Sequence, residues 1–124
     1  MRRTALFIKT SVSVAALVGC LSMIAPLTAS AADAADIAKG KELSFDRKKG
    51  NCLACHMIEG GTLAGNIGPP LVAMKARFPD YEKMKAQIAD PRIKNPNTIM
   101  IPFGPHKVLT AQEIELVSQF IYTL

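Results

Sequence analysis

Two cysteines and a histidine stand close together near the middle of the chain, in the run Asn51-Cys52-Leu53-Ala54-Cys55-His56. This C-x-x-C-H pattern is typical of covalent haem attachment. Two thiols separated by two residues can add to the two vinyl groups of one haem and form thioethers. The adjacent imidazole then lies under the iron, where it can serve as an axial ligand. The spacing therefore predicts one covalent haem c held by Cys52, Cys55 and His56.

The same residue types have other uses, which the surrounding sequence makes less suitable. A C-x-x-C dithiol can be a thioredoxin-like redox centre, but that motif belongs in a βαβ unit and no strand pattern surrounds it here. A zinc site needs four ligands, and only His106 remains to complete the set. A disulfide between Cys52 and Cys55 would close a very small, strained loop. Haem is the chemistry that these residues fit best.

An iron held by His56 has a second axial position, and its occupant separates electron carriers from proteins that bind gases or peroxide. Met100 lies in a proline-rich loop 44 residues after His56, with enough chain to pass around the ring. Three other methionines are less suitable, because one adjoins the histidine and two fall on expected helices, where methionine is more often core filler: Met57, Met74 and Met84. We expect Met100 to be the ligand, with His106 as the next candidate.

The ring nitrogen of His56 that does not face the iron needs a hydrogen-bond acceptor, which fixes the orientation of the ring. Pro69, in the run Gly68-Pro69-Pro70-Leu71, is the candidate through its backbone carbonyl oxygen, because proline restricts the direction of that carbonyl. The alternative interpretation is that Gly-Pro-Pro is only a turn before a helix.

The first 31 residues have the order of a secretory signal peptide. Residues 1–10 carry three basic side chains and no acidic one, residues 11–28 are uncharged and largely apolar, and Ala29-Ser30-Ala31 is a small-residue cleavage site. We therefore expect a signal peptide over residues 1–31 and a mature cytochrome domain over residues 32–124. A retained membrane anchor is the alternative, and Pro26 argues against a long spanning helix.

Two further patterns in this segment bear on the cellular location of the mature protein. Arg2-Arg3 is a twin-arginine pair, but its flanking residues match that signal poorly. Leu17-Val18-Gly19-Cys20 resembles a bacterial lipoprotein cleavage box, which would leave a lipidated Cys20 at the new N-terminus. An apolar run follows Cys20 in place of a polar tether. We expect a periplasmic protein, and the lipoprotein stays open as the alternative.

The composition of the mature part excludes some classes of function. The full chain of 124 residues has 15 basic and 10 acidic side chains and a formal charge of +5. Without its first 31 residues it keeps 12 basic and all 10 acidic side chains, so the charge falls to +2 and nucleic-acid binding is a poor hypothesis. No apolar stretch of the mature part approaches the ~20 residues that span a bilayer.

Helices at both ends of the mature part are expected to frame these residues. Residues 36–48 read as the first helix, with Ile37, Leu43 and Phe45 as candidates for its buried side. Gly40 within it either allows another helix to approach closely or is a glycine that the helix tolerates. Residues 110–113 form a capping box. Apolar side chains then recur at helical spacing, so a helix should run to the chain end.

Shorter elements and a long loop lie between these helices. Residues 71–78, started by Pro70, and residues 81–89, capped by Asp80, read as short helices. Residues 91–105 contain four prolines, so neither helix nor strand is expected there. The apolar side chains of this loop argue that it packs against a large apolar cofactor: Ile93, Ile99, Met100, Ile101 and Phe103. The expected architecture is all-α.

In combination, these features resemble a class I cytochrome c over essentially the whole mature chain. The likeness rests on Cys52-x-x-Cys55-His56, Gly68-Pro69-x-Leu71, Met100 in a proline-containing loop and the terminal helix. The resemblance implies helices and long loops wrapped around one haem. It also implies His56/Met100 ligation, a Pro69 carbonyl that accepts from His56, and a role in electron transfer.

Longer strings are similar to the SoxX family, the small monohaem subunits of the SoxAX cytochromes of sulfur oxidation. They comprise residues 49–56, residues 65–71, residues 95–100 with Pro102-Phe103-Gly104, and Leu109-Thr110 with Glu113-Ile114. In that family proline often follows the ligand methionine, whereas here Ile101 stands in that place and Pro102 follows.

The resemblance to SoxX implies a periplasmic heterodimer with the larger haem subunit SoxA. Such a complex, an L-cysteine S-thiosulfotransferase, oxidatively couples thiosulfate to a cysteine of the sulfur carrier SoxY, with catalysis on the partner's haem. This chain would take up the electrons and pass them to a further cytochrome. The alternatives are a free-standing cytochrome c that shuttles to an oxidase and an open-site haem peroxidase or gas-binding protein.

Overall fold

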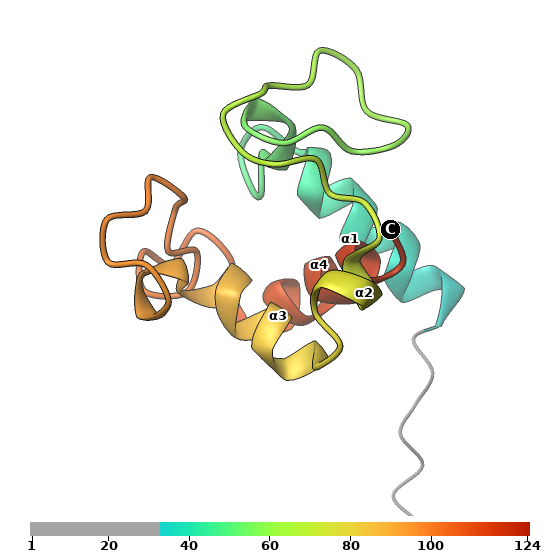
Figure 1. Cartoon of the computed structure of the whole chain (residues 1–124). Helices are drawn as coiled ribbons and strands as arrows, with labels where there is room; N and C mark the ends of the chain where they lie inside the picture. The colour runs from blue at the N-terminus through green and yellow to red at the C-terminus, as the bar shows by residue number, and fades with distance from the viewer. Residues whose placement is uncertain (1–32) are drawn as a thin grey trace, which may run out of the picture.

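The computed structural model describes residues 33–124, which form helices joined by long loops (Figure 1). The elements are α1 (Ala34–Phe45), the 3-10 turn η1 (Cys52–Ala54), α2 (Met74–Arg77), α3 (Tyr81–Ala89), the 3-10 turn η2 (Pro91–Ile93) and α4 (Ala111–Tyr122). No strand occurs in this part of the chain, so the expected all-α architecture is confirmed. The expected signal peptide over residues 1–31 and the Cys20 lipoprotein alternative lie outside the described residues.

Helices α1 and α4 pack directly against each other and form the frame of the domain. Gly40 is buried at their contact, and a Cβ atom added there would overlap the carbonyl oxygen of Leu116. Phe45 and Phe120 meet edge to face, with ring centroids 6.1 Å apart. Of the two interpretations of Gly40, the close approach of a second helix is therefore the one that the structure supports. Helix α1 begins at Ala34, because Asp33 caps it, and ends at Phe45, three residues before the expected end.

The start of α4 follows the capping chemistry of its sequence. The Thr110 hydroxyl accepts a hydrogen bond from the backbone N–H of Glu113, and the Glu113 carboxylate accepts one from the backbone N–H of Thr110. The apolar face of α4 is buried, as its periodicity predicts: Ile114, Val117, Phe120 and Ile121. The helix ends at Tyr122, two residues before the chain end.

The expected helix over residues 71–78 is reduced to the four residues of α2. Ala73 has a positive φ of 51°, a left-handed conformation that stops a helix from continuing through it. The backbone N–H of Met74 instead donates to the carbonyl of Leu124 at 2.8 Å, which joins the start of α2 to the end of the chain. Pro70 therefore does not begin a helix, contrary to the expectation.

Helix α3 is confirmed over the predicted residues, with the Asp80 carboxylate as its cap at 3.2 Å from the backbone N of Lys83. It is joined to α4 through Glu115. The Tyr81 hydroxyl donates to that carboxylate at 2.7 Å, and the Lys85 ammonium lies 3.0 Å from it. Burial raises the pKa of Glu115, but the hydrogen bonds from Tyr81 and Lys85 outweigh it and lower the pKa overall. Burial and the same hydrogen bond raise the pKa of Tyr81.

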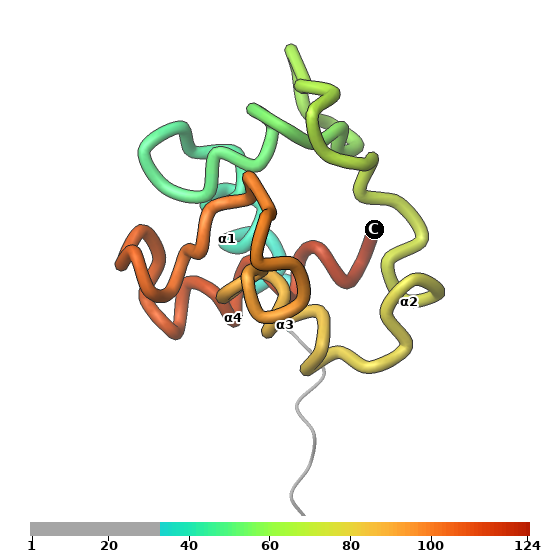
Figure 2. Tube along the Cα trace, turned by 60° about the vertical axis from the view of Figure 1, so that its left-hand side comes forward, coloured from blue at the N-terminus to red at the C-terminus, as the bar shows by residue number. Residues whose placement is uncertain are grey.

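Two long loops extend from this helical frame, one before α2 and one over residues 91–105, between α3 and α4 (Figures 1 and 2). The second loop includes the 3-10 turn η2, where the sequence predicts no helix. Of its five apolar side chains, only Phe103 is buried and Met100 is half-buried, whereas Ile93, Ile99 and Ile101 are exposed. Within residues 33–124, no helix has the length and apolarity to cross a membrane.

We expect Gly40→Ala to lower the free energy of unfolding, although alanine favours a helix over glycine by about 1 kcal/mol. The added methyl group would overlap the Leu116 carbonyl, and overpacking of this kind costs about 1–3 kcal/mol. Denaturant unfolding of the holoprotein measures the difference. Gly104→Ala is the matched control, because the nearest atoms lie 3.5 Å from the carbon added there. Unchanged stability of Gly40→Ala would show that the two helices can separate at no cost.

A second prediction concerns the ion pair between Lys49 and Glu113, whose N and O atoms lie 2.7 Å apart. The hydrogen bond from Lys49 and those of the capping box hold the pKa of Glu113 below its ordinary value of 4.5. Because the folded pKa lies below the unfolded one, this contact stabilises the fold above pH ~4.5 and is lost as the pH falls through the folded pKa.

We therefore expect Glu113→Gln to lower the free energy of unfolding by about 1 kcal/mol at pH 7. The difference from the parent protein should shrink below pH ~4.5. Urea titrations across this pH range provide the measurement. Glu42→Gln is the control, since Glu42 pairs only with Lys39 on the exposed surface of α1. A difference that persists undiminished at pH 3 would contradict the role of the Glu113 charge.

Candidate haem site

The turn η1 brings the two cysteines and the histidine to one wall of a cavity. Asn51 begins the turn in the left-handed conformation, with a φ of 47°, which asparagine adopts more readily than most residues. The backbone N–H groups of Cys55 and His56 both donate to the Cys52 carbonyl, at 3.2 and 2.9 Å. This tight coil places all three side chains against the same space.

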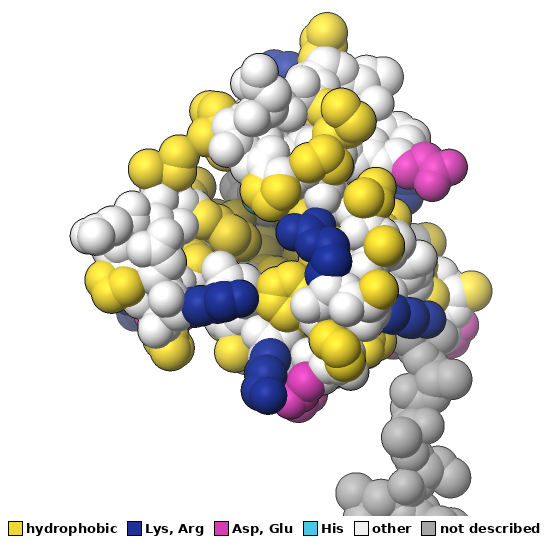
Figure 3. All heavy atoms as spheres, in the orientation of Figure 1, with side chains coloured by type: hydrophobic (Ala, Val, Ile, Leu, Met, Phe, Trp, Pro, Cys, Tyr) yellow, Lys and Arg dark blue, Asp and Glu magenta, His cyan; other side chains and the backbone are white. Residues whose placement is uncertain are grey.

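That space has a volume of about 540 Å³, within the range of cofactor and ligand sites. Figure 3 shows it as a hollow with hydrophobic side chains on its floor and Lys and Arg side chains at its margin. Its walls include apolar residues from α2, α3 and α4 and from the loop that follows η2: Met74, Met84, Ile88, Phe103, Val117 and Ile121. A large, flat, apolar group fits this lining.

The imidazole of His56 is held from two sides. Its Nδ1 lies 2.7 Å from the carbonyl oxygen of Pro69, so the expected hydrogen bond is confirmed. Gly68 lies against the ring, where an added Cβ would overlap Cε1 and would lie 2.6 Å from Nδ1. The Pro69 carbonyl can only accept, so Nδ1 carries the proton and Nε2 keeps a free lone pair for a metal.

The cysteine environment suits a thioether better than a thiolate. Cys52 and Cys55 are not joined by a disulfide. Burial raises the pKa of the Cys52 thiol to about 11, and the hydrogen bond with Ser44 offsets only part of this effect. A thioether carries neither proton nor charge, so burial does not oppose it. A redox-active dithiol needs the opposite shift, towards a lower pKa, which disfavours the thioredoxin-like alternative.

Of the candidates for the second axial position, Met100 borders the same cavity as His56. Its backbone N–H donates to the Thr98 hydroxyl at 3.1 Å, which fixes the backbone next to the side chain. His106 is exposed and does not border the cavity. Met74 and Met84 also border it, buried on helices as expected. No group of three or more His, Cys, Asp or Glu side chains placed to hold a metal ion occurs within residues 33–124.

The structure adds polar side chains to this cavity that the sequence did not indicate, among them Arg77, Gln87 and Lys94. Arg77 is the last residue of α2, Gln87 lies on α3 and Lys94 directly follows η2. All three border the cavity. Their spacing along the chain matches no motif, so only the fold shows that they share one site.

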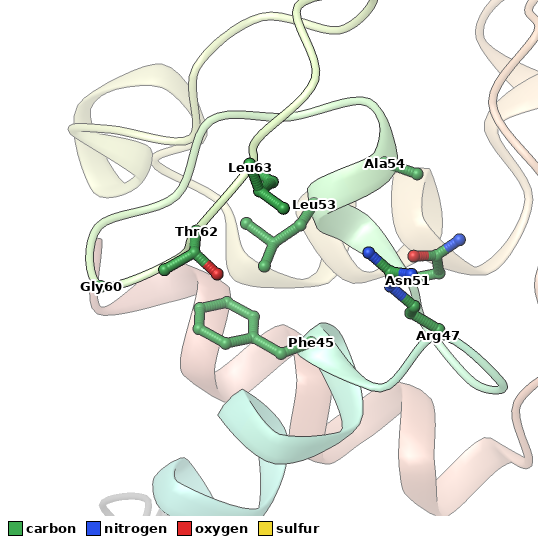
Figure 4. A pocket seen from close by; sticks show the side chains of 8 residues that line it. All are labelled: Phe45, Arg47, Asn51, Leu53, Ala54, Gly60, Thr62 and Leu63. Atoms are coloured by element: carbon green, nitrogen blue, oxygen red, sulfur yellow. The ribbon is translucent and has the colours of Figure 1, made fainter.

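A second, smaller cavity of about 420 Å³ lies between the end of α1, η1 and the loop over residues 60–63. In Figure 4 the side chains of Phe45, Leu53 and Leu63 gather at one end of it, and those of Arg47 and Asn51 at the other. Neither cysteine nor His56 borders this cavity, so it is separate from the haem-binding chemistry.

The helical frame, the C-x-x-C-H turn and the apolar cavity define a haem-binding protein of the all-α class. A family model described as cytochrome c matches residues 37–124, and the chain belongs to the cytochrome c family. It is accordingly an electron-transfer c-type cytochrome, with the covalently bound haem c of that family.

One curated relative resembles part of the chain. An uncharacterized lipoprotein of Aquifex aeolicus (strain VF5) is 36% identical over 76 residues, which cover 60% of this chain and 37% of that protein. The aligned region is therefore little more than a third of the relative's own length.

We expect Gly68→Ala to disturb the site through His56. The added methyl group would occupy space now held by the imidazole ring and would displace Nδ1 from the Pro69 carbonyl. The holoprotein should lose about 1–3 kcal/mol of stability and show an altered midpoint potential, because the orientation of an axial ligand tunes the metal. Unfolding curves and potentiometric titration measure these effects. Gly104→Ala again serves as control, and equal behaviour of the two variants would refute this account of Gly68.

Proposed function

We propose that this chain is a periplasmic monohaem cytochrome c that serves as the electron-transfer subunit of a SoxAX complex. The observation that supports a haem role most directly is the convergence of Cys52, Cys55, His56 and Met100 on one apolar cavity. The SoxAX assignment rests on the strings around the cysteines, around Gly68-Pro69 and around Met100.

In this proposal each residue of the site has one role. Cys52 and Cys55 would hold the haem through thioethers, and His56 would supply Nε2 to the iron while its Nδ1 donates to the Pro69 carbonyl. Met100 would supply the second iron ligand from the loop over residues 91–105. When bound, haem supplies a reversible one-electron couple. A thioether is a weaker donor to ferric iron than an imidazole, so the methionine raises the reduction potential.

The lining of the cavity favours a carrier over an enzyme. No aspartate or glutamate borders it, and the imidazole of His56 is committed to the Pro69 carbonyl. General acid–base catalysis needs a side chain that can exchange a proton with a substrate. With no carboxylate and no uncommitted imidazole at the cavity wall, the sulfur chemistry of the proposed complex would occur on the larger subunit, SoxA, and this chain would accept the electrons.

The proposed partners are SoxA in a stable heterodimer, the sulfur carrier SoxY through the complex, and a downstream electron-accepting cytochrome. A free-standing cytochrome that shuttles to an oxidase is the competing function. Purification of the native complex distinguishes them: a larger haem protein, identified by mass as SoxA, should co-elute with this chain in a fixed ratio. A monomer that elutes alone from cells grown on thiosulfate would overturn the subunit proposal.

The proposed location is the periplasm, after removal of residues 1–31. The lipoprotein relative favours the alternative in which a lipidated Cys20 anchors the protein to a membrane surface. The mass of the mature chain distinguishes the periplasmic protein from the lipoprotein. Cleavage before Cys20 with acylation and cleavage after Ala31 give products of different length. The same mass reports whether one haem is attached.

We expect Met100→Ala to remove the absorption band of the methionine–iron bond, to lower the midpoint potential and to allow the reduced protein to bind carbon monoxide. Optical spectra and potentiometry are the measurements. Met57→Ala is the matched control, because Met57 is 59% exposed and does not border the cavity. An unchanged spectrum of Met100→Ala would remove Met100 from the ligand set and direct the same test to His106.

A further inference from the structure

Two cations at the cavity wall lack a carboxylate partner. Arg77 and Lys94 are the Lys or Arg side chains that border the cavity, and no acidic side chain borders it. Neither forms an ion pair with a carboxylate of residues 33–124, whereas Lys49, Lys85 and Arg92 do so elsewhere on the fold. A cationic pair beside an apolar cavity indicates that the occupant is itself anionic.

The two cations come from different elements that border the same cavity. The Lys94 ammonium lies 5.3 Å from the centre of the Phe78 ring, and Arg77 directly precedes Phe78. A guanidinium nitrogen of Arg77 donates to the Pro70 carbonyl at 2.8 Å, which holds the head group in place. Arg77, Phe78 and Lys94 all border the cavity. The fold thus places two positive charges on the wall of one cavity.

Gln87 provides a second, independent observation. Its side-chain oxygen is buried and has no hydrogen-bond partner, and the residue borders the same cavity. An unsatisfied buried amide is costly and calls for a partner that the protein itself does not supply. Rotation about the terminal bond exchanges the oxygen with the NH₂ group, so Gln87 can present a donor to the occupant.

Haem carries two propionate groups, on the half of the ring away from the vinyl groups. Thioethers to Cys52 and Cys55 would fix the vinyl half at η1, so the propionates would lie at a distant part of the wall. In Figures 1 and 2 the green turn that holds the cysteines and the yellow α2 lie well apart. Two carboxylates in an apolar cavity are expensive unless they are paired, and the wall offers two cations and one amide.

We propose that Arg77 and Lys94, with Gln87 as a neutral donor, form the subsite for the haem propionates, and that Lys94 thereby positions the loop that carries Met100. This inference rests on the haem role proposed above. Successive turns connect Lys94 to Met100: the Thr98 N–H donates to the Asn95 carbonyl at 3.0 Å, and the Met100 N–H donates to the Thr98 hydroxyl at 3.1 Å. An ion pair at Lys94 therefore fixes the start of a hydrogen-bonded segment that ends at Met100.

The experiment compares the red holoprotein with its Lys94→Gln and Arg77→Gln variants by potentiometry from pH 5 to pH 9. Loss of a cation beside a propionate favours the ferric state, so the midpoint potential should fall. The pKa of that propionate should also rise, so the potential should decrease with pH across a window in which the parent protein is flat. In Lys94→Gln the methionine–iron band should be lost at a lower pH than in the parent.

Lys75→Gln is the matched control, because Lys75 is an exposed cation of α2 that does not border the cavity. Lys94→Arg keeps the charge and should restore the parent potential and its pH profile. If Arg77→Gln yields no holoprotein, the exposed Lys94 still decides the outcome. Identical potentials and pH profiles for Lys94→Gln and Lys75→Gln would overturn the inference. A colourless parent protein would instead overturn the proposed haem role, so the two failures are distinguishable.

Discussion

The hydrogen bond between His56 Nδ1 and the Pro69 carbonyl is the contact on which the site depends. It joins the turn that carries the cysteines to the loop that enters α2, and it leaves Nε2 free for a metal. The contact is possible only because Gly68 has no side chain, since any Cβ there would occupy the space of the imidazole ring. Two backbone hydrogen bonds support it on either side, from Gly68 to Cys55 at 2.8 Å and from Leu71 to Met57 at 2.9 Å.

Helices α1 and α4 form the frame around this contact. The cavity lies beside this frame, and its wall includes residues of the hydrophobic core. Val117 and Ile121 of α4 belong both to the buried core and to the cavity wall, as do Met84 and Ile88 of α3. The helices therefore share one core that continues into the cavity. The ion pair between Lys49 and Glu113 joins the start of α4 to the segment just before Cys52, so helix packing and the position of the cysteines are linked.

Local chemistry made the starts of α3 and α4 and the His56 contact predictable. The capping box at Thr110, the cap at Asp80 and the crossing at Gly40 each depend on residues that are close in sequence or on one missing side chain. The α2 segment was not predictable in this way, because its start is set by a hydrogen bond to Leu124 at the other end of the chain. The placement of Arg77, Gln87 and Lys94 on one cavity was not predictable for the same reason, because it depends on how separate parts of the chain pack together.

The loop around Met100 carries apolar side chains that the protein itself does not cover. Ile99 and Ile101 are 79% and 46% exposed, and both border the cavity together with the exposed Ile67. Apolar side chains at the edge of an apolar hollow gain cover when a large flat group occupies it, because contact area is then removed from water. The sequence predicted burial against a cofactor rather than against the protein. For a cytochrome c the covalent haem is thus part of the core, and the polypeptide supplies the wall around it.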